Sequence, residues 1–439
     1  MISCLPTPII AKRDFENGKG IPMVWVGLLI VLGTFALIIK NYETRMVLFL
    51  SGALMAILGG DLVVAANAFI KQFTNSGLVP IVCTVMGFSY VIRSTKCSEH
   101  LVAVVTGLLN HVKFFVVPGT VIVTFFLNIS LPSAAGVSAA VGTLLIPMLL
   151  ALRVKPVMAG SAVFLGTWGS VISPGFMFNP LVADMAKTDV MTVIANLAPA
   201  VLIALCVAVL ILTATSFILK EGVGSCPLSL QKALPEGFKV NPLYAMVPIV
   251  PLVLLVLGSK QVGVLPYISV PQSMIVGVVL AIVVTRSSPG QTTKEFFRGA
   301  GDSFCEVIGL MACAAMFCAG MEQIGLTSAL LDAMKNSTSA TQIAATAGPF
   351  LMSVVSGSGN AASLAFIGSV VPHAPDFGYS ITELGGVAQV SAALGRTMSP
   401  VAASAIICAR LAGVNPMSMA KRNALPTIAA AVTVSFILL

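Results

Sequence analysis

The sequence predicts an all-α polytopic membrane protein built as an inverted repeat, and three observations lead to this prediction. First, hydrophobic residues make up 57% of the 439 residues and charged residues 9%, with a mean hydropathy of +1.01, which excludes an ordinary soluble domain. Second, charge-free apolar runs of about 18 or more residues recur along the chain, each long enough for a helix to cross a bilayer. Third, a pattern of helix-breaking residues occurs twice at a constant spacing.

The breaks are short clusters of Gly, Ser, Pro and Asn, which are poor residues for a helix interior. In the first half they occupy Ser130–Gly136 and Gly169–Pro174, and in the second half Val355–Asn360 and Gly395–Pro400. The two Gly-x-x-x-Ser-Pro segments begin 226 residues apart, and the other two clusters are offset by 225. A shared offset predicts an internal duplication. We therefore expect five spans, one re-entrant helical hairpin and one broken helix in each repeat.

Residues 1–21 form an N-terminal segment, and residues 22–219 form repeat 1. This repeat is expected to hold spans at 22–40, 46–60 and 77–93, an amphipathic segment at 98–111, a hairpin at 114–152, a broken span at 156–186 and a span at 193–219. The charged stretch 220–241 is then the cytoplasmic linker between the repeats.

Residues 242–439 repeat this order. The second half is expected to hold spans at 242–258, 268–285 and 302–325, amphipathic segments at 291–300 and 326–335, a hairpin at 336–375, a broken span at 383–412 and a last span at 423–439.

Each long charge-free run could be two full crossings or one re-entrant hairpin. The arms on either side of the central break have only about 16 residues, which is short for a crossing. The turns also carry no charge, whereas a turn in water usually does. These features favour re-entrant hairpins.

The distribution of Lys and Arg predicts the orientation. With the N- and C-termini outside, 16 of the 24 Lys and Arg residues lie inside and seven outside, as the positive-inside rule requires. Because each half then has an odd number of spans, the halves have opposite orientations. This is the inverted-repeat plan of secondary transporters, in which discontinuous helices meet near the midplane.

Arg396 is the strongest candidate binding residue. It is the only charge between Glu383 and Arg410, and a lone cation within the membrane marks a functional site by default. Its fork can hold a carboxylate, as can helix N-termini and hydroxyls at the four breaks. The expected substrate-binding residues are Ser133, Ala134, Ser170, Ser173, Ser358, Gly359, Asn360, Arg396, Thr397 and Ser399. The expected cation-binding residues, with carbonyls freed at the breaks, are Ser130, Gly136, Asn179, Ser356 and Gly395.

Structural interpretations compete with these assignments. Gly-Ser-Gly segments often serve close helix packing, and Arg396 could cap carbonyls or neutralise a buried carboxylate. Six cysteines fall inside predicted spans without C-x-x-C spacing, so neither a disulfide framework nor a metal site is expected. No cofactor is expected either, apart from Na⁺ or H⁺ as a coupling ion.

The segments Gly395–Ala403, Ser356–Asn360 and Ser130–Gly136 resemble the anaerobic C4-dicarboxylate carrier (DcuC) family of the ion transporter superfamily. The resemblance implies a carrier of succinate, fumarate or malate in the bacterial inner membrane. It also implies cation-coupled symport or antiport, a homodimer, and elevator motion of the hairpins and broken spans against a scaffold of the other spans. Better-known symporters of the superfamily carry Ser-Asn-Thr at both tips, whereas this chain has Pro-Ser-Ala and Gly-Ser-Gly-Asn.

Other functions remain open at this stage. A Na⁺/H⁺ antiporter would need a carboxylate at the midplane, and none is found; a carrier of another small organic anion fits the same pattern. An intramembrane hydrolase is disfavoured, because the fragment Gly136-Val-Ser138 has no histidine at matching depth. The net charge of +8 comes from residues scattered at helix ends, so nucleic acid is not an expected partner.

Overall fold

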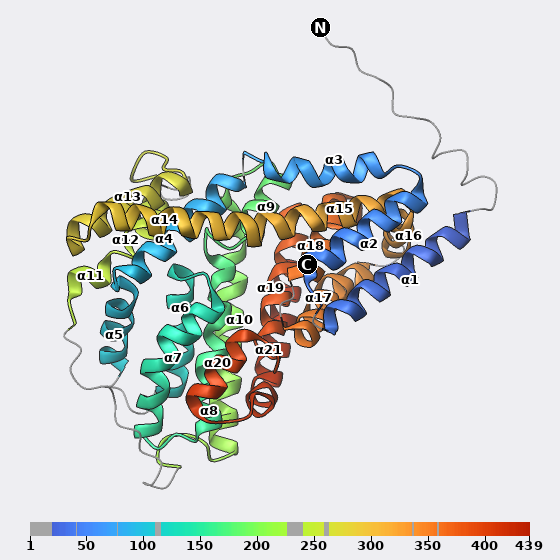
Figure 1. The fold of residues 1–439 in the computed structure, drawn as a ribbon. Coiled ribbons are helices and arrows are strands. Elements are labelled where there is room, and N and C mark those ends of the chain that lie inside the picture. Colours follow the sequence, from blue (N-terminus) through green and yellow to red (C-terminus); the bar gives the residue numbers. More distant parts are fainter. Residues whose placement is uncertain are drawn as a thin grey trace.

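The computed structural model describes residues 20–40, 42–76, 78–109, 116–225, 240–258, 263–335, 338–357 and 360–439. All regular secondary structure in these ranges is helical (Figure 1). The architecture therefore belongs to the all-helical class that the sequence predicts.

The first half of the chain forms ten α-helices and one 3₁₀ segment within the described ranges. Their bounds are α1 (Gly20–Ile39), α2 (Thr44–Gly59), α3 (Leu62–Phe73), α4 (Val79–Ser94), α5 (Cys97–Leu109), α6 (Val116–Ser130), α7 (Ala134–Ala151), α8 (Pro156–Leu165), η2 (Gly166–Ile172), α9 (Phe178–Met185) and α10 (Val190–Ile218).

The second half is equally helical. Its elements are α11 (Pro242–Met246), α12 (Val250–Leu257), α13 (Val270–Thr285), α14 (Pro289–Ser303), η4 (Phe304–Ile308), α15 (Gly309–Gln323), α16 (Leu326–Lys335), α17 (Thr338–Ser356), α18 (Asn360–Ser369), η5 (Val371–Phe377), α19 (Ile381–Arg396), α20 (Ala403–Ala412) and α21 (Pro416–Leu438).

Side-chain caps set several of these helix starts. Asp61 and Asp189 each accept a hydrogen bond from a backbone N–H two residues further on, at the starts of α3 and α10. At the start of α19, Ser380 and Glu383 form a capping box in which each side chain accepts the other residue's backbone N–H. Such caps satisfy donors that a helix start leaves without an intrahelical partner.

One long helix crosses the whole molecule. The segments α14, η4 and α15 join into one helix from Pro289 to Gln323, with a π-helical bulge at Phe304–Ile308. We expected an amphipathic segment at 291–300 followed by a separate span, and this expectation is wrong. Because no proline lies between the two parts, the chain absorbs the change of environment in a bulge rather than in a break.

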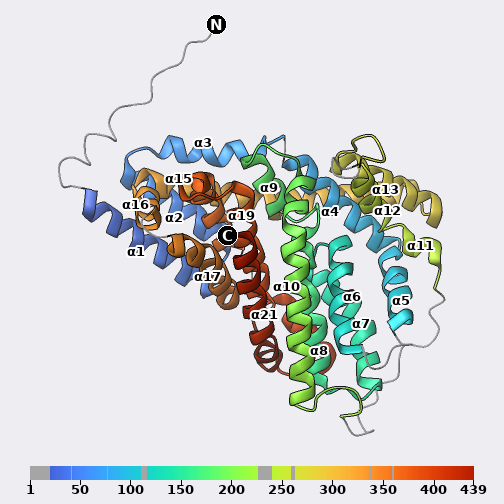
Figure 2. The same ribbon diagram turned by 180° about the vertical axis from the view of Figure 1, so that it is seen from behind.

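The other helices are arranged around this crossing helix. It contacts α2, α3 and α4 along its length. Figures 1 and 2 show α1, α2 and α16 near one of its ends and α11, α12 and α13 near the other. Below it stand α6, α7, α8, α10, α20 and α21, with α10 packed against α21 and α7 against α20.

The outer surface suits a lipid environment. Large apolar side chains such as Ile218 (78% exposed), Phe436 (76%) and Leu29 (69%) point away from the core. Three helices in the described ranges are long and apolar enough to cross a membrane, namely Ala134–Ala151, Val190–Ile218 and Pro289–Gln323, and shorter apolar helices accompany them. An exposed apolar surface of this extent is expected of a multi-pass membrane protein.

Candidate functional site

The turn between α6 and α7 is fixed by a buried asparagine. The Asn128 side chain donates to the carbonyl of Leu131 (2.8 Å) and accepts from the backbone N–H of Ser170 (2.8 Å). Ser133 caps α7, where its hydroxyl oxygen accepts from the N–H of Gly136 at 3.1 Å. The turn and the interrupted segment after α8 are therefore held together by one fully buried amide.

A second amide holds the break between α8 and α9. Between these helices the chain passes through η2 and a bend that contains Ser173. The buried Asn179 side chain donates to the carbonyls of Val171 (2.8 Å) and Ser173 (2.9 Å). Its oxygen accepts from Gln389 of α19 at 3.0 Å. Asn179 thus satisfies backbone carbonyls that the break frees, as buried polar groups require.

Arg396 connects the two interrupted spans. It is the last residue of α19, and its Nη2 donates to the carbonyl oxygen of Thr167 in η2 at 2.8 Å. Thr167 has non-helical dihedral angles, so its carbonyl is turned out of the regular helical ladder. The Nε of Arg396 is buried and has no hydrogen-bond partner among the described residues. One edge of the guanidinium is thus anchored, and Nε remains available as a donor.

The segment after Arg396 is tightly turned. The hydroxyl of Thr397 donates back to Leu394 (2.7 Å), and the carbonyl of Thr397 accepts from Asn423 of α21 (3.1 Å). The backbone N–H of Ser399 donates to the carbonyl of Arg396 at 3.0 Å. These bonds fix the direction of the chain between α19 and α20.

The end of α17 packs on the same segment. Gly357 has φ +74°, and a Cβ there would lie 2.9 Å from the backbone nitrogen of Ala402. Only glycine therefore suits this position, both for its dihedral angle and for its space. Ser358 and Gly359, which we expected to bind substrate, lie outside the described residues, and α18 starts at the predicted Asn360.

Several buried polar atoms at these breaks have no protein partner. They are the hydroxyls of Ser170 and Ser399, the indole N–H of Trp168 and the Nε of Arg396, among the residues that the structure describes. Ser170, Ser399 and Trp168 are fully buried. Because unpaired polar groups are costly in a low-dielectric interior, such a group of donors and acceptors favours a polar ligand or water.

The remaining predicted residues have local roles or line cavities. Ser356 donates to the carbonyl of Met352 (2.7 Å), and Gly395 packs directly on the backbone of Phe350. Ser130 and Ser173 line a small cavity against α4, α12 and α13, while Ser133 and Gly136 line one of about 440 Å³ against α4 and α5. Ala134 is the buried first residue of α7.

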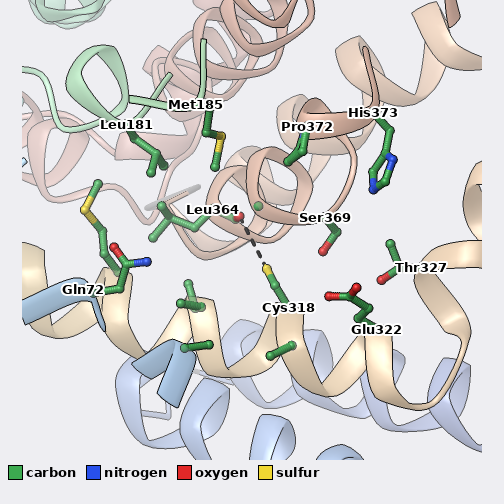
Figure 3. Close-up of a pocket in the computed structure, with 16 residues that line it drawn as sticks. Gln72, Leu181, Met185, Cys318, Glu322, Thr327, Leu364, Ser369, Pro372 and His373 are labelled. Carbon is green, nitrogen blue, oxygen red and sulfur yellow. Dashed lines mark hydrogen bonds between the residues drawn. The ribbon is translucent and has the colours of Figure 1, made fainter. Parts of the chain in front are cut away.

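A further cavity of about 310 Å³ lies between α15 and the segment α18–η5 (Figure 3). Figure 3 shows the carboxylate of Glu322 close to Thr327, with Ser369 and His373 on the opposite wall. The Thr327 hydroxyl is buried without a partner among the described residues. The sulfur of Cys318 faces the carbonyl of Leu364 at 3.9 Å.

Sequence reasoning missed three amides that organise the breaks, namely those of Asn128, Gln389 and Asn423. Each is fully buried and bonds to the backbone or to Asn179. The available signal was the position of each amide inside an apolar stretch, where an unpaired amide would be costly.

No protein-family model matches the chain. Among individual proteins, an uncharacterized transporter of Haemophilus influenzae is 38% identical over 266 residues, which cover 58% of this chain and 95% of that protein. An anaerobic C4-dicarboxylate transporter, DcuC, of Vibrio cholerae is 22% identical over 450 residues, covering 93% of this chain and 95% of that one. The DcuC protein of Escherichia coli K12 is 26% identical over 200 residues, 44% of this chain and 43% of its own.

Solved structures give the same picture of the fold. The YdaH transporter of Alcanivorax borkumensis superposes with a TM-score of 0.57 at 16% identity, covering 94% of this chain and 97% of that one. MtrF of Neisseria gonorrhoeae, described as illuminating a class of antimetabolite efflux pumps, has a TM-score of 0.57 at 14% identity and covers 85% and 84%.

Fold and homology together define a multi-pass membrane transporter and not an enzyme. The chain belongs to the transporter family of the Haemophilus influenzae protein, and its more distant homologues are C4-dicarboxylate transporters of the DcuC type.

Proposed function

We propose that this protein is a secondary active transporter of C4-dicarboxylates such as succinate, fumarate and malate, coupled to cations. The observation that carries the proposal is the guanidinium of Arg396, which is anchored on the Thr167 carbonyl while its Nε is buried without a partner among the described residues. The distant homologues named as C4-dicarboxylate transporters support the same substrate class.

The chemistry of the breaks fits a dianion. A carboxylate on the Nε side of Arg396 would gain a charge-assisted hydrogen bond of about 1.5–3 kcal/mol. The unpaired hydroxyls of Ser170 and Ser399 lie in the segments that flank the Arg396–Thr167 contact. Net negative charge that remains after pairing with one cation calls for a coupling ion. The freed carbonyls at the breaks suit Na⁺, and H⁺ is the alternative.

The proposal includes an inverted repeat with re-entrant hairpins α6–α7 and α17–α18. Gly169 and Gly395, which are 226 residues apart, each pack on the backbone of a phenylalanine, Phe125 and Phe350, and these are 225 apart. The pairs α6–η2 and α17–α19 contact each other in the same way. Equivalent packing at a constant offset supports one unit used twice.

Transport is proposed to follow an elevator mechanism in a homodimer of the bacterial inner membrane, with both termini outside. In this proposal the helices α6–α10 and α17–α21 move against α1–α5 and α11–α16. The excess of Lys and Arg on one side sets the orientation, and the long crossing helix α14–α15 is the natural scaffold.

The alternative of a Na⁺/H⁺ antiporter has less support. Among the described residues Glu221 is the only acidic one that is buried, and it is bound bidentately by Arg422. A carrier of another small organic anion shares every feature above, so competition between anions is part of the test.

The test is uptake of labelled succinate by proteoliposomes, with and without a Na⁺ or proton gradient. We expect gradient-dependent uptake by the wild type, competition by fumarate and malate, and background uptake by Arg396→Gln. Arg410→Gln removes the same charge from an exposed position in α20 and is the matched control. Size-exclusion profiles and melting temperatures show whether both variants fold. Uptake by folded Arg396→Gln at the wild-type rate contradicts the proposed role.

A further inference from the structure

The cavity of about 440 Å³ lies where α7 begins, between the turn of α6–α7 and the helices α4 and α5. It is the largest of the cavities described above. Its polar lining includes Ser89, Arg93, Ser98, Glu99 and Ser133. Among the described lining residues Arg93 is the basic one and Glu99 the acidic one, and the two are not ion-paired.

Arg93 is held at the mouth of α7 by stacking. Its guanidinium carbon lies 5.3 Å from the ring centre of Tyr90, and the hydroxyl of Tyr90 donates to the carboxylate of Asp302 on α14 at 2.8 Å. The Nη2 of Arg93 lies 3.4 Å from where a Cβ on Gly136 would be. This arrangement fixes the position of the cation through an aromatic ring and leaves its N–H groups free of bonds to the described residues.

The cavity in Figure 3 has a different charge at the equivalent place. Position 318, which is 225 residues after Arg93, holds a cysteine, and that cavity contains Glu322 and His373 instead of an arginine. The backbone plan of the two cavities is alike, since each lies between the second helix of a hairpin and two neighbouring helices. A basic residue is therefore a specific feature of the cavity beside α7.

We propose that Arg93 is an anion-capture residue, which makes the first contact with a dicarboxylate that enters the cavity beside α7. The inference rests on the proposed transport function and goes beyond it by assigning a second anion site, separate from the Arg396–Thr167 contact. With the proposed orientation, this cavity faces the cytoplasm. Tyr90 and Asp302 act as positioning residues for Arg93, and Glu99 weakens capture by repelling the same anion.

A capture residue affects transport in a recognisable way. A cation in a narrow cavity raises the local concentration of a dianion, and this effect decreases as salt screens it. Arg93 is exposed, so its effect is on encounter and weak binding and not on the translocation step. KM therefore changes while kcat stays, and only for substrate on the side to which the cavity opens.

The first test measures succinate transport in inside-out and right-side-out membrane vesicles. We expect Arg93→Gln to raise KM on the cytoplasmic face about five- to tenfold at low salt, with kcat unchanged and no effect on the other face. Glu99→Gln lowers the same KM, and Tyr90→Leu reproduces part of the Arg93→Gln effect. Lys294→Gln, which removes an exposed charge from α14, leaves KM unchanged. In about 1 M salt, where the Debye length is about 3 Å, the difference disappears.

The second test does not require transport. Phenylglyoxal modifies accessible arginines, and mass spectrometry gives its rate at Arg93 and at the exposed control Arg298. We expect succinate to slow modification of Arg93 but not of Arg298, both in the wild type and in the Arg396→Gln variant. If wild-type protein fails to transport while Arg93 is protected, the proposed function is wrong and the capture site stands. If Arg93 is not protected, or Arg93→Gln raises KM equally on both faces, the capture site is refuted.

Discussion

Replacing Gly395 by alanine should damage the contact on which the position of Arg396 depends. Gly395 lies one residue before Arg396, and a Cβ at this position would lie 2.9 Å from the carbonyl carbon of Phe350 and 3.0 Å from its Cα. The neighbouring atoms belong to the backbone of α17, so no side chain can move aside. The helices α17 and α19 must therefore separate or rotate to accommodate one methyl group.

The magnitude follows from this overlap. Ordinary contacts between carbon atoms need about 3.5–4.0 Å, so the helices must separate by roughly 0.5–1 Å. Overpacking of this kind costs about 1–3 kcal/mol. Because larger proteins shift by about 2–4 °C per kcal/mol, the melting temperature should fall by about 2–10 °C. Transport should fall further, since the same displacement moves Arg396 relative to Thr167.

The assay compares the melting temperature and succinate uptake of Gly395→Ala with those of Gly348→Ala. Gly348 lies in α17 close to the same contact, but a Cβ there would meet nothing within 4 Å. That control should be neutral or gain up to about 1 kcal/mol from its higher helix propensity. Gly169→Ala should behave like Gly395→Ala, because its Cβ would lie 2.8 Å from the carbonyl carbon of Phe125. If Gly395→Ala melts and transports like Gly348→Ala, the packing argument is refuted.

Three further predictions concern contacts away from Gly395. Arg422 binds the buried Glu221 bidentately at 2.8 and 3.0 Å, so Glu221→Gln should destabilise the protein by about 3–5 kcal/mol, measured by thermal unfolding. Partial burial and the hydrogen bond to Asp189 raise the pKa of Tyr267 to about 12. Because the folded-state pKa is the higher one, this contribution to stability is present below about pH 10 and is lost as the pH rises towards 12, and ultraviolet titration against Tyr267→Phe checks it. Asn128→Ala should reduce uptake and lower the melting temperature by leaving a buried carbonyl and a buried N–H unpaired, at about 1–3 kcal/mol each, whereas Asn128→Asp should restore the bond to the N–H.

The positions of the helix breaks could be predicted from the sequence because they depend on local chemistry. Ser133 caps a helix, Gly357 adopts a positive φ angle, and Pro174 and Pro400 follow interrupted helices, and each residue type signals these properties by itself. The lone charge of Arg396 was equally visible. Its contact with another break, far away in the sequence, agrees with the expectation that the breaks of the two halves come together.

The partners in these contacts could not be predicted in the same way. Arg396 bonds to a backbone carbonyl, and a carbonyl has no residue type that the sequence could reveal. Asn128 and Gln389 owe their roles to tertiary neighbours in other helices, although each lies in an apolar stretch. The continuous helix from Pro289 to Gln323 was missed because a change in polarity resembles a boundary, while the backbone passes through it with a π-bulge.

The two halves share a backbone plan but differ in charge, and this difference bears on how a dianion is held. Position 170, the counterpart of Arg396, is a serine, and position 318, the counterpart of Arg93, is a cysteine. Two identical halves would present either two arginines or none at the interrupted spans. A single guanidinium can neutralise one carboxylate, so the second must rely on hydroxyls, helix N-termini or a coupling cation. The asymmetry thus favours a substrate bound by one end to Arg396, with a cation required at the other end.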